Sequence, residues 1–292
     1  MFEAYLIHLA ILICIYAVLA ISLDLAMGYT GLMNMGHVAF FGIGAYTSAL
    51  LNMAGVPFIV SMLAGALLAG IFGFILSWPT SRLRGDYLAL ATLGFSFIIE
   101  SFMKNWTSLT RGPLGIPGIP RPNIFGLVIS SQLSYMIFSL IVMVVCFFII
   151  TRIEKSPFGR LLEAVRDDEV AAKTLGENVR HIKSMGLLVS AFFAGIAGSL
   201  YAHYISFIDP TTFSILEVIL LFSIIIVGGL GSSKGALIGT IIILLIPEPL
   251  RFIGFPSSIV GPARQIIYAL LLLLIIYFKP KGLFGRVKLG EN

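Results

Sequence analysis

The chain carries few charged side chains. It has 19 Lys or Arg and 14 Asp or Glu among 292 residues, together 11%, whereas a soluble domain carries about 25% charged residues to cover its surface. Apolar types make up 58% of the chain, and phenylalanine alone accounts for 23 residues. Too few polar groups remain to face water. The composition therefore excludes a soluble enzyme and a disordered chain, and it indicates a polytopic membrane protein.

Cysteine is scarce as well. The two cysteines, Cys14 and Cys146, both lie inside apolar runs, so they fit neither a disulfide framework nor a metal site. We interpret them as packing residues and expect no bound metal. A secreted disulfide scaffold is excluded on the same grounds.

Basic residues are absent from the first 81 positions, although the net charge is +5. Seven of the 19 Lys and Arg residues lie between Arg152 and Lys183. That distribution is typical of a membrane protein with one large cytoplasmic loop, because such loops collect positive charge. It does not indicate a basic groove, so we expect no nucleic acid as a partner.

Apolar runs long enough to cross a bilayer, about 20 residues as a helix, recur along the chain. They predict an all-α polytopic membrane protein with about nine transmembrane helices, within a range of eight to ten, in a single domain over residues 1–292. The first span lacks a basic leader and a cleavage site, so we expect it to stay uncleaved. The second is rich in glycine and the eighth is short, which suggests tilted, broken or re-entrant segments. The predicted spans are 4–26, 34–53, 57–78, 86–103, 127–151, 185–207, 214–230, 235–250 and 262–278.

The basic residues also orient these spans. With nine spans and a cytoplasmic C-terminus, 14 Lys or Arg residues fall in cytoplasmic segments and five in external ones. This arrangement satisfies the positive-inside rule and places the N-terminus outside. A topology with eight spans and the N-terminus inside stays open, because residues 1–81 contain no Lys or Arg. The external residues would be Lys104, Arg111, Arg121, Arg251 and Arg264.

Small residues repeat at four-residue steps in the third and sixth predicted spans. Such faces let two helices approach closely, so that dispersion forces hold them together. We therefore predict a tight bundle, whose small faces would also let helices slide. The rows are Gly65, Ala69, Gly73 and Ser77; Ser190, Ala194, Gly198 and Ala202; and Ala191, Gly195, Ser199 and His203.

Glycine interrupts the apolar pattern at two places, Gly28–Gly31 and Gly228–Gly231. Paired interruptions in two halves of a membrane protein point to an internal repeat and a pathway at the midplane. The second string continues to Lys234, but no glycine precedes that lysine and no strand leads into it, so it is not a phosphate-binding loop. We expect no nucleotide and no cofactor on this chain.

Residues 152–184 form the only long polar stretch of the sequence. Ser156 followed by Pro157 is typical of a helix start, and Gly176 is placed to end that helix. An apolar stripe at helical spacing between them predicts an amphipathic element that lies on the membrane or docks into a partner. The stripe consists of Leu161, Leu162, Val165, Ala172 and Leu175.

The string EVAAKTLG at 169–176 resembles the EAA loop of ATP-binding-cassette (ABC) importer permeases, with Val170 inserted after the glutamate. The longer string GRLLEAVRDDE at 159–169 resembles the version in the branched-chain amino acid permeases. Other strings similar to that family follow in order from about residue 20 to 285, and the likeness is greatest to its M-type subunit. They are GLMNMGHVAF at 31–40, RLRGDYLALATLG at 82–94, GIAGSLYAHY at 195–204, GGLGS at 228–232 and Pro247-Glu248.

The resemblance implies a division of labour. An extracytoplasmic binding protein would capture the amino acid, and this chain with a second, dissimilar permease would form the path through the lipid. Two ATPases, with ATP and Mg²⁺, would drive the cycle from the cytoplasm of a bacterial or archaeal plasma membrane. This chain would have no catalytic residue, and its loop 152–184 would lie in a cleft of one ATPase. The residues implied in coupling are Gly159, Arg160, Glu163, Arg166, Asp168, Glu169, Ala171, Ala172 and Gly176.

Ionisable residues within the predicted spans need an explanation, because a charge at mid-bilayer costs at least about 2.5 kcal/mol. Asp24 and Glu248 lie close to span ends, where capping or snorkelling is the simple explanation. Glu100 precedes Lys104 by one turn, which predicts an ion pair at the outer interface. Glu217 lies near the start of its span and is again an interfacial candidate.

A zwitterionic cargo with an apolar side chain would need backbone groups at broken helices and apolar walls. Lone histidines and aromatics in membrane helices are more often packing residues, so a role in the path is a hypothesis that no spacing proves. The candidate path residues are Asn34, His37, Phe40, Phe95, Tyr201, His203, Gly229 and Gly231.

Two other functions remain possible at this stage. An importer of urea, short amides or sugars would have the same architecture. An ion-coupled secondary transporter would need ionisable relays deep in several spans and would not need an ATPase-docking loop. The few ionisable residues within the spans and the EAA-like loop both argue against this class.

Overall fold

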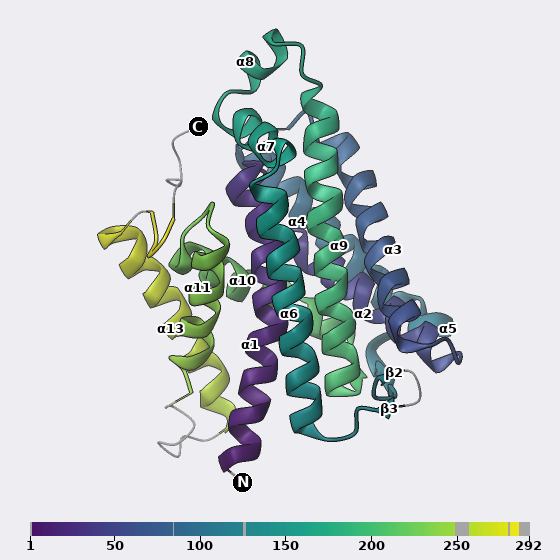
Figure 1. The fold of residues 1–292 in the computed structure, drawn as a ribbon. Coiled ribbons are helices and arrows are strands. Elements are labelled where there is room, and N and C mark those ends of the chain that lie inside the picture. Colours follow the sequence, from purple (N-terminus) through teal and green to yellow (C-terminus); the bar gives the residue numbers. More distant parts are fainter. Residues whose placement is uncertain (1, 84, 125–126, 249–256, 280, 286–292) are drawn as a thin grey trace.

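The computed structural model describes residues 2–83, 85–124, 127–248, 257–279 and 281–285. It confirms the predicted all-α polytopic membrane fold. Long helices form a bundle (Figure 1), and the strands among the described residues are four two-residue segments that make two short antiparallel pairs. Helix α1 (Phe2–Asp24) begins at one end, and the polar helices α7 (Pro157–Asp167) and α8 (Glu169–Thr174) project from the other. The remaining elements are η1 (Leu25–Tyr29), α2 (His37–Met53), α3 (Phe58–Thr80), α4 (Gly85–Asn105), α5 (Thr107–Thr110), η2 (Gly112–Leu114), β1 (Ile116–Pro117), β2 (Asn123–Ile124), β3 (Leu127–Val128), α6 (Gln132–Glu154), α9 (Val179–Ile205), β4 (Phe207–Ile208), η3 (Pro210–Phe213), α10 (Ile215–Gly228), α11 (Ser233–Leu245) and α13 (Ser257–Phe278).

A helix corresponds to each of the nine predicted spans, but their lengths differ. Among the described residues, six helices are long and apolar enough to cross a membrane: α1, α3, α4, α6, α9 and α13. Helices α2, α10 and α11 have only 17, 14 and 13 residues. Because 14 residues of α-helix extend about 21 Å, α10 and α11 are each shorter than a hydrocarbon core of about 30 Å.

The rows of small residues lie where helices cross, as predicted. Helix α9 packs between α2 and α3, and its Gly195 faces both: a Cβ there would lie 2.7 Å from the Cα of Ala66, and a Cβ at Gly44 would lie 2.3 Å from the carbonyl oxygen of Gly195. Further along the same crossing, the Ser77 hydroxyl donates to the Ser184 hydroxyl at 2.6 Å. These contacts make α2, α3 and α9 the closely packed centre of the bundle.

Both predicted glycine breaks are present. After α1 the chain widens into the π-helical turn η1, and Gly31 (φ +71°) directs it out of the helix before α2 begins at His37. Between α10 and α11 the chain reverses at Gly229 (φ +101°) and Gly231 (φ +76°). Helices α10 and α11 thus form a short helical hairpin, defined here as residues 215–245.

The C-terminal part of the described chain returns to this hairpin. The backbone N–H of Leu283 donates to the carbonyl of Val227 at 3.0 Å, and that of Phe284 donates to Gly228 at 2.9 Å. These bonds satisfy carbonyls that the end of α10 would otherwise leave without partners. Residues 281–285 therefore lie at the end of the bundle that carries α7 and α8, opposite the start of α1 (Figure 1).

Several polar residues of the spans are explained by local contacts. Glu100 pairs with Lys104 at 2.6 Å, as predicted. The Tyr16 hydroxyl donates to Glu217 and joins α1 to the first turn of α10. Asp24 is the last residue of α1 but is fully buried, so it does not snorkel to a membrane surface.

Replacing Gly198 with alanine should destabilise the bundle. The added Cβ would lie 1.9 Å from the carbonyl oxygen of Phe41, and overpacking of this kind costs about 1–3 kcal/mol. The matched control is Gly94→Ala on α4, where nothing lies within 4 Å of an added Cβ. Thermal unfolding in detergent should show a lower midpoint for the first variant alone. Equal midpoints for both variants would contradict the close helix crossing.

Candidate functional site

The polar loop begins with a tightly built helix start. The Ser156 hydroxyl accepts a hydrogen bond from the Gly159 N–H at 3.2 Å, and Pro157 occupies the first helical position. A Cβ at Gly159 would lie 2.1 Å from the carbonyl oxygen of Glu154. Glycine is therefore required at 159 because α7 turns back against the end of α6.

Helix α7 is held to the bundle by its apolar face. Leu162 and Val165 are buried in a small cluster that also contains Tyr29 of η1 and Ile182 of α9. Leu161 packs at the edge of this cluster. The helix therefore lies against two membrane helices rather than free in solvent.

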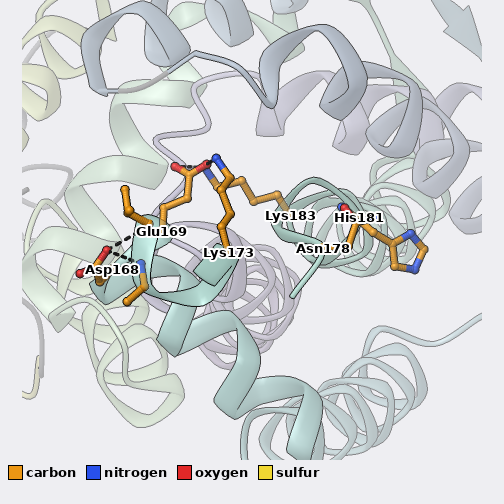
Figure 2. A network of polar contacts seen from close by, with 8 residues as sticks. Asp168, Glu169, Lys173, Asn178, His181 and Lys183 are labelled. Carbon is orange, nitrogen blue, oxygen red and sulfur yellow. Dashed lines mark hydrogen bonds and ion pairs between the residues drawn. The ribbon is translucent and has the colours of Figure 1, made fainter. Parts of the chain in front are cut away.

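The predicted helix over 156–176 is not continuous, which corrects the sequence prediction. Asp168 adopts an extended conformation (φ −152°, ψ 100°), so α7 ends at Asp167 and a separate helix, α8, begins at Glu169. Both the Val170 and the Ala171 N–H groups donate to the Asp168 carboxylate at 2.9 Å (Figure 2). A short acidic side chain prefers this capping position over the interior of a helix, which explains the break.

Helix α8 is tied down by two lysines. The Glu169 carboxylate pairs with Lys173 and with Lys183 of α9, each at 3.1 Å (Figure 2). Burial by itself raises the pKa of Glu169, but the hydrogen bonds and charges of the two lysines outweigh it, so the pKa of this carboxyl lies below its ordinary value. Lys183 is only 9% exposed. Glu169 therefore fixes α8 to the first turns of α9.

The tip of the loop carries exposed apolar residues. Ala172 is buried, but Leu175 is 84% exposed and Val170 is 59% exposed. The apolar stripe predicted on one face therefore does not include Leu175, because the break at Asp168 changes the direction of the second helix. Gly176 (φ +90°) ends α8, as predicted.

Arg166 connects the loop to the first glycine break. Its guanidinium donates to the carbonyl of Gly28 at 2.6 Å and pairs with the neighbouring Asp167 at 2.8 Å. Other residues with a predicted coupling role have outward positions: Arg160 is exposed and Glu163 is half-buried. The structure thus divides the predicted set into anchors and outward-facing groups. The anchors are Gly159, Arg166, Asp168, Glu169 and Ala172, and the outward-facing or tip residues are Arg160, Glu163, Ala171 and Gly176.

The candidate path residues do not form one group. Asn34, His37, Phe40 and Phe95 lie together: the Asn34 amide nitrogen is 3.5 Å from the His37 ring, and the rings of Phe40 and Phe95 are 5.5 Å apart. The Ser22 hydroxyl also contacts the His37 ring at 2.9 Å. His37 therefore has polar neighbours on both α1 and the segment that leads into α2.

The other path candidates lie elsewhere. Tyr201 packs against Phe41, with ring centroids 5.4 Å apart, and His203 is fully buried against Phe58. Gly229 and Gly231 form the turn of the hairpin at the end of the bundle that carries the loop. The side-chain contacts therefore join Asn34, His37, Phe40 and Phe95 into one cluster.

Two buried contacts of this region carry no clear sequence signal. Glu154, at the end of α6, is 8% exposed and accepts a hydrogen bond from the Ser233 hydroxyl at the start of α11. Lys183 reaches back across 14 positions to Glu169. Sequence alone does not distinguish a buried charged residue in a polar stretch from an exposed one, because its partner lies on another helix.

The chain is similar to known proteins over nearly its whole length. A family described as "Branched-chain amino acid transport system / permease component" matches residues 5–277. The Escherichia coli K12 "high-affinity branched-chain amino acid transport system permease protein LivM" is 35% identical over 97% of this chain and 70% of its own length. A probable LivM permease of Methanocaldococcus jannaschii is 26% identical over 92% of this chain and 90% of its own length. The E. coli K12 LivH permease of the same description is 25% identical over 93% of this chain and 91% of its own length. No solved structure matches.

Replacing Lys183 with methionine should free α8, because the ion pair that joins α8 to α9 is lost. A nitroxide label at Leu175 should then show faster motion than in the unmodified chain. Lys234→Met, which changes an exposed lysine at the same end of the bundle, is the control and should leave the label unaffected.

The same label should respond to acid. The lowered pKa of Glu169 means that the ion pairs persist at and above the ordinary glutamate pKa of about 4.3. They are lost only as the pH falls through the lower value found in the folded protein. A label whose motion increases already near neutral pH would contradict the ion-pair anchor.

Proposed function

The chain belongs to the family of branched-chain amino acid transport permeases, and on that premise we propose that it is one of two dissimilar membrane subunits of an ATP-driven importer of branched-chain amino acids. Relatives of both permease names, LivM and LivH, match nearly the whole chain, which supports a permease pair. The greater identity to LivM supports the M-type role. In this proposal residues 1–292 are a single permease domain and not an enzyme.

The observation that carries the proposal is the form of the α7–α8 loop. It projects from one end of the bundle (Figure 1), and capping and ion pairs hold it rigid. At its tip Leu175 and Val170 are exposed although they are apolar. An apolar tip on a rigid polar base fits a partner with an apolar cleft, and we assign that partner as the ATPase, which binds ATP and Mg²⁺.

The distribution of charge supports the orientation that this proposal needs. Residues 152–184 contain seven of the chain's 19 Lys and Arg residues, which is typical of a cytoplasmic segment. Residues 281–285 lie at the same end of the bundle, so we propose a cytoplasmic C-terminus in a bacterial or archaeal plasma membrane. The opposite end, with its glycine- and proline-rich segment 111–120, would face the extracytoplasmic binding protein.

The same proposal gives an approximate position for the translocation path of the amino acid. The cluster of Asn34, His37, Phe40 and Phe95 lies beside the first glycine break. It combines polar groups with aromatic walls, as a zwitterion with an apolar side chain requires. We propose that this cluster borders the path, whereas His203 is a packing residue.

Transport by the complete complex tests the function. The two permeases, the ATPases and the binding protein would be purified together and placed in liposomes, and uptake of labelled leucine would be measured. We expect uptake that needs both ATP and the binding protein. Uptake driven by a proton or sodium gradient without ATP would refute the proposal, and uptake of urea or sugars but not leucine would refute the cargo.

Leu175→Asp should weaken the attachment of the ATPase by about tenfold or more, because a buried leucine contributes about 1.5–3 kcal/mol and a carboxylate would be placed in an apolar cleft. Co-purification of the ATPase with the tagged permease measures this effect. Leu114→Asp is the matched control, since Leu114 is 82% exposed in η2, just before the β1–β4 pair at the end of α9 that lies away from the loop. Equal recovery of the ATPase with both variants would place the docking surface elsewhere.

A further inference from the structure

The two glycine breaks of the chain meet at one buried carboxylate. Asp24 is fully buried, and its Oδ1 accepts a hydrogen bond from the backbone N–H of Gly231 at 2.8 Å. The close approach requires glycine at position 28, because a Cβ there would lie 2.3 Å from that oxygen and 2.3 Å from the backbone nitrogen of Gly231. The end of α1 is thereby bonded to the turn of the hairpin.

This bond has an unusual partner. A buried polar group that is left unpaired costs about 1–3 kcal/mol, and an aspartate near a helix end normally finds a partner in its own segment. Asp24 instead reaches across 207 positions to a turn whose two glycines have positive φ values. The carboxylate therefore fixes the position of the hairpin turn relative to α1.

The other side of the same break is held by the loop. Arg166 of α7 donates to the Gly28 carbonyl at 2.6 Å, and its aliphatic stem packs on Gly31, where a Cβ would lie 2.9 Å from the Arg166 Cγ. The π-helical turn η1 lies between these contacts, and π-helical turns are a conformation that often marks functional sites. Arg166 thus contacts the same π-helical turn that begins directly after Asp24, so a shift of α7 would act on that turn.

A second contact runs in parallel. Glu154, three residues before Pro157 of α7, accepts a hydrogen bond from the Ser233 hydroxyl on the other side of the hairpin turn. The hairpin turn is thus bonded on one side, through Ser233, to the end of α6, which leads into α7. On the other side it is bonded, through Gly231, to Asp24 at the end of α1. The opposite end of α10 is bonded separately, through Glu217 and Tyr16 of α1.

We propose that Asp24 is a positioning residue that passes the movement of the loop to the hairpin, so that the α10–α11 hairpin is the part of this chain that moves when the partner closes. This inference rests on the proposed function, because it needs an ATPase that moves the loop. It goes further in assigning the moving element and one side chain, Asp24, that bonds this element to the turn contacted by Arg166 of the loop.

The test uses the complete complex in liposomes and measures two rates, leucine uptake and ATP hydrolysis. Asp24→Leu has a similar size but no acceptor, so we expect the leucine taken up per ATP hydrolysed to fall at least about tenfold while hydrolysis stays within about twofold of the unmodified complex. Asp24→Asn keeps an acceptor oxygen for the Gly231 N–H and should restore most of the ratio. A purely structural role would lower assembly, hydrolysis and uptake together.

A second variant breaks the contact in another way. Gly28→Ala places a Cβ against the backbone of Gly231 and should also lower the ratio, whereas Gly94→Ala, with open space around it, should not. If Asp24→Leu fails to assemble, Gly28→Ala decides the question. An unchanged ratio in Asp24→Leu, or in Gly28→Ala when Asp24→Leu does not assemble, overturns the inference.

A distance measurement separates this inference from the proposed function. Spin labels at Lys234, beside the turn, and at Leu114, at the opposite end, should change their separation when ATP is added to the unmodified complex, and should not change it in Asp24→Leu. Failure of the unmodified complex to take up leucine with ATP would refute the proposed function itself. Uptake with ATP but an unchanged label distance would refute only the moving hairpin.

Discussion

A broken helix in a membrane must find partners for every backbone group that the break releases, since lipid offers none. This constraint explains the arrangement around residues 24–31 and 228–231. The end of α10 receives two N–H donors from Leu283 and Phe284, the turn receives the carboxylate of Asp24, and the first break receives the guanidinium of Arg166. The loop, the first helix and the C-terminal segment therefore meet at the two glycine breaks, where they supply hydrogen-bond partners for the backbone groups of the breaks.

The rest of the bundle serves as the fixed frame against which these parts sit. Helices α2, α3 and α9 approach each other so closely that a single Cβ at Gly195 or Gly44 would collide with backbone atoms. Packing of this kind has no room for small displacements. A movement delivered by the loop would therefore be taken up by the hairpin, whose helices are short and whose turn depends on a few hydrogen bonds.

Sequence reasoning succeeded where the signal was local. Apolar runs predicted the positions of nine helices, six of which are long and apolar enough to cross a membrane among the described residues. Four-residue spacing predicted the small faces and glycine strings predicted both breaks, because each of these features depends on neighbours along the same segment. It failed at Asp168. The apolar stripe predicted one continuous helix, but the structure has two, because Asp168 adopts an extended conformation and caps the start of the second. It also made four spans longer than the helices found there, α2, α6, α10 and α11, since the hydropathy of a segment does not record where the helix begins and ends.

The contacts between distant segments were beyond that reasoning. Asp24 was expected to cap a helix or to snorkel because it lies close to the end of an apolar run. The neighbouring sequence contains no sign of its actual partner, the Gly231 N–H, which lies 207 positions later. The same holds for Glu154 and Ser233. The predicted loop residues were placed by a resemblance to known proteins, and the structure adds which of them are anchors and which face outward.

The amides of Leu283 and Phe284 that close the end of α10 have one more consequence, for the order of assembly. A ribosome makes the hairpin well before it makes these two residues, and α13 must enter the bilayer in between. Until then the last carbonyls of α10 have no backbone donor from this segment. We therefore expect the hairpin to mature late during biogenesis, after the final helix has been inserted.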